Sequence, residues 1–249
     1  MTESIVFVHG SGRSGRDCWP GQVNVFPDAS YLVMPGHGEE PPRATDMTEC
    51  VSRVLAACGH AAVVVAHSFG AIAAVLAAEQ APRRIRGLVL LEPALYSLAR
   101  GRDAVDAHVV KMTPVFERAA GQEPGDFWAA FMSALTGAPG RVPGAEPGRS
   151  VAERLRLQRP PWEFEISPRV FEAVPALVIT GDWNREYEEI AEALEALGAR
   201  HEVVRGRGHR VQDDSRVNAL LAGFFAASDR RHHRQPAGGL PDVSNRAAD

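Results

Sequence analysis

The feature that most constrains the fold of this chain is the alternation of short apolar runs with longer segments of helical character. Apolar runs bounded by Gly or Pro are typical of strands buried on both faces, as in a parallel sheet covered by helices. The alternation therefore predicts the α/β class, with a mostly parallel sheet flanked by helices. The runs expected to form strands cover residues 5–8, 31–34, 61–66, 88–91, 176–180 and 201–204.

Segments of helical character fill the gaps between these runs. Polar residues that can cap a helix N-terminus stand before two of them, Thr45 and Asp46 before the first and Asp213 and Asp214 before the last. Gly198 follows the third segment, as expected just beyond a helix C-terminus. The predicted helices cover residues 47–58, 70–79, 186–197 and 215–226.

The connection between the fourth and fifth predicted strands is too long for a simple crossover, at about eighty residues. It contains a helical piece at residues 126–135 and a Gly/Pro-rich stretch at 137–148. We expect residues 97–168 to form an inserted helical lid that sets substrate choice, with 1–96 and 169–228 as the core. Residues 229–249 are polar and aperiodic, which predicts a disordered tail, and His232 and His233 within it are assigned no metal.

Composition excludes several classes of protein. No apolar run approaches the roughly 18 residues of a membrane span, and the chain lacks the features of a secretory signal. The net charge of −4, with dispersed basic residues, argues against a nucleic-acid partner. Cys18, Cys50 and Cys58 are odd in number and form no CxxC pair, so free thiols in the cytoplasm are expected, without a metal site. Composition does not indicate an oligomeric state.

The most informative segment is the turn Ala66-His67-Ser68-Phe69-Gly70, which joins a buried strand to a helix rich in small residues. This context is typical of the G-x-S-x-G elbow, in which a strained backbone lifts the serine hydroxyl clear of the sheet. Ala66 replaces the first glycine of the motif, a difference of one methyl group, and Gly70 is retained. Ser68 is therefore the candidate nucleophile.

Two further segments support this interpretation. Val6-Phe7-Val8-His9-Gly10-Ser11-Gly12 is a strand ending in an HG turn, where the backbone amide of Ser11 can pair with that of Phe69 to bind an oxyanion. His209 lies in Arg207-Gly208-His209-Arg210, directly after the last predicted strand. A histidine in that loop stands where a general base would reach Ser68.

Together these segments resemble the α/β-hydrolase superfamily. They occur in the order of the family from near residue 5 to residue 226, with the predicted lid unmatched. The resemblance implies the α/β-hydrolase fold and a Ser-His-acid triad. The matching segments are His9-Gly10-Ser11-Gly12, Met34-Pro35-Gly36-His37-Gly38, Ala66-His67-Ser68-Phe69-Gly70, Leu90-Leu91-Glu92-Pro93, residues 175–183 and Gly206-Arg207-Gly208-His209.

The resemblance leaves two carboxylates open as the triad acid. Family members usually carry the acid three residues after the glycine that ends the 176–180 strand, and this position is Asn184, which has no charge. Asp182 lies two residues earlier, in an unusual register. Glu92 follows the preceding strand and resembles the catalytic glutamate of haloalkane dehalogenases and their relatives. We favour Glu92 and keep Asp182 as the alternative.

The expected function is hydrolysis of a small, fairly apolar ester, thioester or related acyl substrate through an acyl-enzyme, without a metal or organic cofactor. A non-catalytic binding protein of this fold is one alternative. A nucleotide-cofactor oxidoreductase is another, because Gly10–Gly15 fits G-x-G-x-x-G, although no carboxylate ends the second strand. Aromatic candidates for an acyl pocket are Trp19, Phe69, Phe127, Trp128, Phe131, Trp162 and Trp183.

Overall fold

The computed structural model describes residues 4–138 and 148–234, and its centre is a six-stranded sheet. Every pair of neighbouring strands is parallel, which confirms the predicted α/β class. The spatial order of the strands is β2 (Ser30–Tyr31), β1 (Ser4–Val8), β3 (Ala62–His67), β4 (Ile85–Leu91), β5 (Ala176–Thr180) and β6 (Arg200–Val203).

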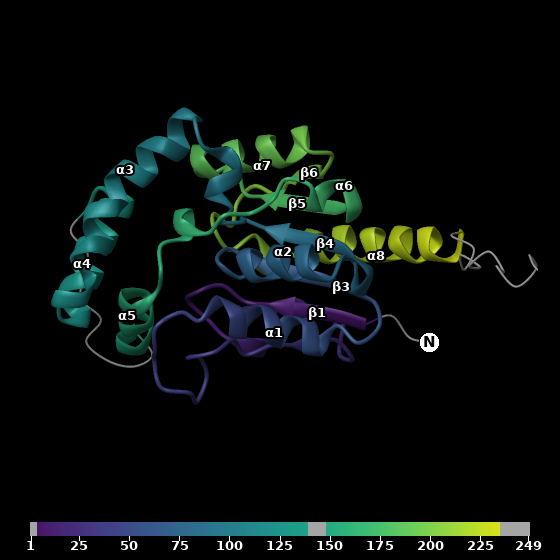
Figure 1. Cartoon of the computed structure of the whole chain (residues 1–249), viewed down its shortest axis with the longest axis horizontal. Helices are drawn as coiled ribbons and strands as arrows, with labels where there is room; N and C mark the ends of the chain where they lie inside the picture. Colours follow the sequence, from purple (N-terminus) through teal and green to yellow (C-terminus); the bar gives the residue numbers. More distant parts are fainter. Residues whose placement is uncertain (1–3, 139–147, 235–249) are drawn as a thin grey trace, which may run out of the picture.

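Helices cover both faces of this sheet (Figure 1). Side chains alternate across each strand, so that Val64 faces one apolar core and Val65 the other. The first core is closed by α1 (Met47–Ala57), α2 (Gly70–Gln80), α6 (Val170–Ala173) and α7 (Arg185–Ala196), and the second by α8 (Arg216–Arg234). None of the helices in the described ranges is both long and apolar enough to cross a membrane.

Most of the segment between β4 and β5, up to the short helix α6, lies beyond the carboxyl ends of the strands (Figure 1). It contains α3 (Asp103–Glu117), α4 (Pro124–Thr136), which includes the predicted 126–135 helix, and α5 (Gly148–Leu157). These helices share a small apolar cluster of their own that includes Phe127. The boundaries of a lid at residues 97–168 stay a prediction, and residues 139–147 of the Gly/Pro-rich stretch lie outside the described residues.

Short 3-10 helices complete the connections. They are η1 (Gly15–Cys18), η2 (Pro82–Arg84), η3 (Tyr96–Ala99), η4 (Ala119–Gly121), η5 (Pro161–Glu163) and η6 (Val211–Asp213).

Most predicted bounds differ from the observed ones by one to three residues, and two differences are explained by specific contacts or change a prediction. In place of the predicted 31–34 strand, β2 covers only Ser30–Tyr31: the Leu32 amide still donates to Phe7 O on β1 at 3.0 Å, but the Met34 amide donates to the side chain of His9. The predicted 229–249 tail is wrong for its first part, since α8 continues to Arg234. Asp229 forms an ion pair with Arg86 at 2.9 Å, which ties this part of the helix to β4. Residues 235–249 lie outside the described residues.

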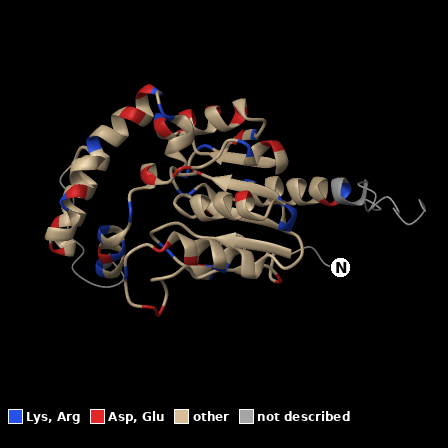
Figure 2. Cartoon of the chain, viewed as in Figure 1, with Lys and Arg blue, Asp and Glu red and all other residues tan. Residues whose placement is uncertain are grey.

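Acidic residues of α7 hold the start of α3 in place. The amides of Ala104 and Val105 donate to Glu189 Oε2 at 2.9 and 3.1 Å, which satisfies free N–H groups of the first turn. Arg102 pairs with Glu192 at 2.9 Å. The acidic residues along α7 and the charges at the start of α3 are visible in Figure 2. The first turn of α3 is therefore fixed to the sheet domain.

Candidate active site

Ser68 occupies the sharp turn between β3 and α2. Its φ of +53° lies in the left-handed region, which a residue with a side chain adopts only when the surrounding structure imposes it. The turn is held from both sides: the Ser68 amide donates to Leu91 O at 2.9 Å, and its carbonyl accepts from Ala71 at 3.0 Å. The hydroxyl is thereby presented at the carboxyl edge of the sheet.

A close approach of two backbones requires the glycine at the start of α2. A Cβ on Gly70 would lie 2.3 Å from the carbonyl oxygen of His9, far inside van der Waals contact. The elbow therefore packs directly on the HG turn that follows β1. This close approach explains why position 70 is a glycine.

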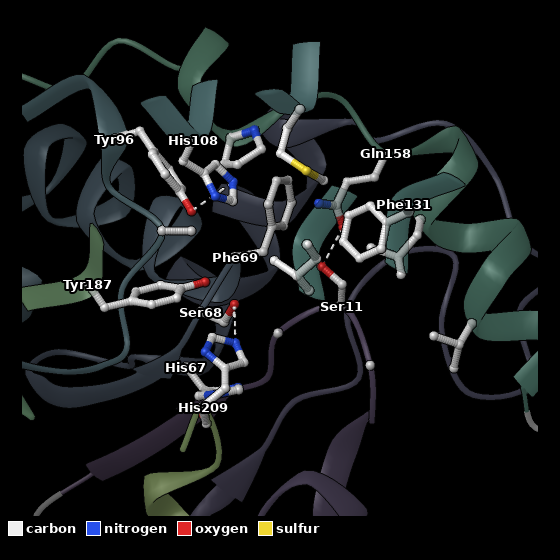
Figure 3. Close-up of a pocket in the computed structure, with 18 of the residues that line it drawn as sticks. Ser11, His67, Ser68, Phe69, Tyr96, His108, Phe131, Gln158, Tyr187 and His209 are labelled. Atoms are coloured by element: carbon white, nitrogen blue, oxygen red, sulfur yellow. Dashed lines mark hydrogen bonds between the residues drawn. The ribbon is translucent and has the colours of Figure 1, made fainter. Parts of the chain in front are cut away.

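His209 lies beside the hydroxyl of Ser68, with 3.0 Å between Nε2 and Oγ (Figure 3). It comes from the loop after β6. Its backbone carbonyl accepts a hydrogen bond from His67 Nε2 at 2.8 Å, so the elbow also holds the loop that carries His209. Burial lowers the pKa of His209 below its ordinary value, which keeps the imidazole neutral near pH 7 and able to accept a proton.

Glu92 follows β4 and is completely buried. Its Oε1 accepts from the Gly181 amide at 2.6 Å, and its Oε2 accepts from Trp183 Nε1 at 2.8 Å. Oε2 also lies 3.4 Å from His209 Nδ1, a long contact of the kind that apo sites often show. Burial raises the pKa of Glu92 to about 7, although the bonds from Trp183 and Gly181 favour the charged form.

Asp182 lies apart from this group. Its carboxylate pairs with Arg205 at 2.6 Å on the surface, where 44% of the Asp182 side chain is exposed. Asn184, two residues later, caps α7 by accepting from the Glu186 amide at 3.1 Å. The structure thus brings Ser68, His209 and Glu92 together and leaves Asp182 outside.

The two amides expected to bind an oxyanion line the same cavity. In residues 4–138 and 148–234, the backbone N–H groups of Ser11 and Phe69 donate to no other protein group. Phe69 directly precedes α2, so the partial positive charge of a helix N-terminus supports its amide. The Ser11 hydroxyl donates to Gln158 Oε1 at 2.5 Å, which connects this loop to the segment after α5.

The HG turn is stabilised by its own histidine. His9 Nδ1 donates to Gly10 O at 2.6 Å, and Nε2 accepts from the Met34 amide at 2.9 Å, a pattern that only the neutral ring can make. Burial lowers the pKa of His9 to about 3. His9 therefore fixes the loop that carries Ser11.

The Gly-rich loop after β1 does not continue into a long helix. The Gly10–Gly15 loop leads into η1, a 3-10 helix of four residues, rather than into the long helix whose N-terminus would bind a pyrophosphate. Within the described residues, no group of three or more His, Cys, Asp or Glu side chains is arranged to hold a metal ion.

A cavity of about 510 Å³ opens in front of Ser68, between the sheet edge and helices α3 to α5. Five of the seven aromatic residues proposed for an acyl pocket line it, namely Phe69, Trp128, Phe131, Trp162 and Trp183. Trp19 and Phe127 are instead fully buried in apolar cores. Aliphatic residues from α3 to α5, such as Met112 and Leu155, complete the apolar wall.

The residue pattern of the alpha/beta hydrolase family matches residues 5–222 of the chain. The chain belongs to this family. It is an α/β-fold hydrolase, as the resemblance in its motifs implied.

Individual relatives of this alpha/beta hydrolase are distant. One curated protein, the dihydrolipoyllysine-residue acetyltransferase component of an acetoin cleaving system from Cupriavidus necator, is 34% identical over 100 residues, covering 36% of this chain and 26% of that protein. A carboxylesterase structure from Nitrososphaera gargenis has a TM-score of 0.63 at 15% identity, covering 92% of both chains. A thermophilic esterase from Thermogutta terrifontis has a TM-score of 0.61 at 19% identity, covering 92% of this chain and 91% of that one. At 15% and 19% sequence identity, these two structures show that the fold is shared and nothing more specific.

Several polar residues of the hydrolase pocket were not predicted from the sequence. Tyr96, His108, Tyr187 and Gln158 all line the cavity. Each lies outside the family motifs, and three of them come from segments without a recognisable pattern. The position of Tyr187, in the first turn of a predicted helix behind the Gly181 loop, was the one available signal.

Proposed function

We propose that this alpha/beta hydrolase cleaves a small carboxylic ester, thioester or related acyl substrate through an acyl-enzyme on Ser68. The observation that carries the proposal is the 3.0 Å contact between His209 Nε2 and Ser68 Oγ, with the Glu92 carboxylate behind the ring. A serine hydroxyl is a weak nucleophile until a neighbouring base takes its proton. His209, held neutral by burial, is suited to that task.

In the first half of the reaction, His209 Nε2 takes the Ser68 proton as Oγ attacks the carbonyl carbon. The carbonyl oxygen becomes an oxyanion, which accepts hydrogen bonds from the Ser11 and Phe69 amides. The imidazolium then gives its proton to the leaving oxygen or sulfur as the scissile bond breaks. Glu92 orients His209 and stabilises its charged form, since the negative carboxylate lies behind Nδ1.

In the second half, water takes the place of the leaving group. His209 accepts a proton from this water, and the resulting hydroxide attacks the acyl carbon. The tetrahedral intermediate collapses, Ser68 recovers its proton from His209, and the carboxylic acid is released. Water is the one co-substrate that this hydrolysis consumes, and Glu92 stays charged throughout the cycle.

The walls of the cavity support an apolar acyl group. Aromatic and aliphatic side chains from α3 to α5 make up most of its surface, and the helices form the roof over Ser68. These helices act as the lid that selects the substrate. The esterases among the solved structures support ester chemistry on this fold.

A fluorophosphonate test distinguishes this proposal from a non-catalytic binding protein. The reagent captures a serine only when a base and an oxyanion hole activate it. We expect intact-mass analysis to find one adduct and peptide mapping to locate it at Ser68. Ser68→Ala and His209→Ala should abolish the adduct, and Ser52→Ala, which changes an exposed serine on α1, should keep it. A folded wild-type protein that forms no adduct would overturn the catalytic proposal.

A further inference from the structure

One corner of the apolar cavity is polar. Tyr96, His108 and Tyr187 line this corner (Figure 3). Together with Glu186, which accepts a hydrogen bond from Tyr96, we call them the polar corner. The chain has three tyrosines in total, and two of them are here. All four residues are nearly buried, with exposed fractions of 2%, 8%, 5% and 9%. Burying so many polar groups beside a reactive serine costs free energy and points to a role.

Three residues of the polar corner form a connected network, and the fourth, Tyr187, points toward the nucleophile. The Tyr96 hydroxyl donates to Glu186 Oε1 at 3.1 Å and also lies 3.3 Å from His108 Nε2. His108 Nδ1 lies 2.5 Å from Glu186 Oε2. The Tyr187 side chain and its hydroxyl lie in the same cavity. Figure 3 shows this hydroxyl pointing to Ser68 from the side opposite Phe131.

In the neutral form of His108 that carries its proton on Nδ1, facing Glu186 Oε2, the network of Tyr96, His108 and Glu186 has more acceptor atoms than protons. Tyr96 has a single proton, and two acceptors compete for it, Glu186 Oε1 and His108 Nε2. Among the described residues, Glu186 has no arginine or lysine partner, and His108 is its one ion-pair contact. A group that brings an additional proton would therefore complete the network.

The start of α3 is docked by residues outside the polar corner. Glu189 and Glu192 already hold the first turn of α3 and its preceding arginine. The Tyr96, His108 and Tyr187 side chains instead form part of the cavity wall, where a substrate can reach them.

We propose that the polar corner recognises a hydrogen-bond-donating substituent, a hydroxyl or an amino group, on the acyl part of the substrate. This rests on the proposed function, whose substrate class it narrows to hydroxy- or amino-substituted acyl esters and thioesters. Because the Tyr187 hydroxyl points toward Ser68, the substituent lies on the second or third carbon of the acyl chain, close to the scissile carbonyl. The apolar remainder of the chain then packs on the aromatic wall.

The test compares p-nitrophenyl esters of butyric, 3-hydroxybutyric and 3-aminobutyric acid. We expect the wild-type protein to prefer at least one substituted ester over the butyrate by about tenfold in kcat/KM, the contribution of one hydrogen bond. Comparing the 3-hydroxybutyrate ester with the 3-aminobutyrate ester shows whether the polar corner recognises a hydroxyl or an amino group. A preference for plain butyrate over both substituted esters would overturn the proposal.

Tyr96→Phe removes one oxygen from the polar corner, and Tyr31→Phe is its matched control. Tyr31 lies on β2 and donates to Phe26 O at 3.0 Å, away from the cavity. We expect Tyr96→Phe to bring the substituted-to-plain ratio close to one while butyrate is still hydrolysed. Tyr31→Phe should leave the ratio unchanged. A ratio that survives in Tyr96→Phe would contradict the assignment.

Binding to Ser68→Ala separates the two proposals. This variant cannot form an acyl-enzyme, so calorimetry with methyl butyrate and methyl 3-hydroxy- or 3-aminobutyrate reports recognition alone. Tighter binding of a substituted ester, lost when Tyr96→Phe is added, supports the polar corner even if fluorophosphonate fails to label wild-type Ser68. Equal or weaker binding of both substituted esters contradicts it even if Ser68 is labelled.

Discussion

His67 Nε2 donates a hydrogen bond of 2.8 Å to the backbone carbonyl of His209. The bond joins the residue before the nucleophile to the residue proposed as the base, across 142 positions of sequence. Because Ser68 and the His209 carbonyl are both fixed relative to His67, this contact sets the distance between Oγ and Nε2. Burial lowers the pKa of His67 well below its ordinary value, so the ring stays neutral and Nε2 keeps its proton as a donor.

Replacing His67 tests this positioning role. We expect His67→Leu to lower kcat by up to about 100-fold with little change in KM, because a displaced base misaligns the chemistry without altering the cavity. His67→Gln keeps a side-chain N–H donor and should recover part of the loss. Steady-state kinetics on a hydrolysed ester, with circular dichroism as a check on folding, measures both. Equal effects of the two substitutions would contradict a role based on the hydrogen bond.

The acid limb of the pH–rate profile should report Glu92. Its pKa is raised to about 7, so below this pH the carboxyl is neutral and cannot stabilise a charged His209. We expect kcat/KM to rise with pH with a midpoint near 7, as a property of the Glu92–His209 pair. Glu92→Gln should reduce kcat/KM by about 10⁴-fold and move the limb to lower pH, where His209 alone titrates.

Asp182→Asn is the matched control for Glu92→Gln. Asp182 is paired with Arg205 at the surface, and its replacement should leave both the rate and the midpoint within about twofold of wild type, as for a surface substitution. If Asp182→Asn abolished activity while Glu92→Gln retained it, Asp182 would be the acid of the triad.

Gly70 should tolerate no side chain. The added methyl group of Gly70→Ala would meet the His9 carbonyl oxygen at 2.3 Å, and backbone must move to relieve the overlap. We expect a loss of about 3 kcal/mol or more in the free energy of unfolding, measured by urea denaturation. Gly223→Ala, in α8 with no atom within 4 Å of the new Cβ, should instead stabilise the protein by about 0.5–1 kcal/mol. A Gly70→Ala protein as stable as wild type would contradict the close approach of elbow and HG turn.

The parts of the site that could be predicted are those encoded locally. A buried strand, a serine and a small-residue helix are contiguous in sequence, so the elbow at Ser68 follows from its own segment. His209 could be predicted because parallel strands bring their carboxyl ends to one edge, where the last loop meets the elbow. In the same way, Glu92 ends a central strand and lies at that edge.

The polar corner could not be predicted, because it is formed by three elements from two distant parts of the sequence. Tyr96 comes from η3, His108 from α3, and Glu186 and Tyr187 from α7. Their meeting depends on the path of the segment after β4, which follows no family motif. The hydrogen bonds that hold the Glu92 carboxylate beside His209 could not be predicted from the sequence either. They depend on the Gly181 amide and Trp183 Nε1 pointing toward Glu92.

Buried titratable groups should give stability a pH dependence with two opposing parts. His9 and His67 have lowered pKa values, so their contribution to stability is present above about pH 6.5 and is lost as pH falls below it, which for His9 continues to about pH 3. Glu92 has a raised pKa, so its contribution is present below about pH 4.5 and is lost as pH rises to 7. Between pH 5 and 6 the unfolded chain therefore binds extra protons at the histidines, while the folded protein holds one extra proton on Glu92.

We expect the free energy of unfolding to rise with pH between pH 5 and 6. In Glu92→Gln it should rise more steeply, by about 1.4 kcal/mol per pH unit, because the proton that the folded protein held on Glu92 is gone. Urea denaturation at pH 5.0, 5.5 and 6.0 measures both slopes. Parallel slopes would mean that Glu92 is already charged in this range, and that the bonds from Gly181 and Trp183 outweigh its burial.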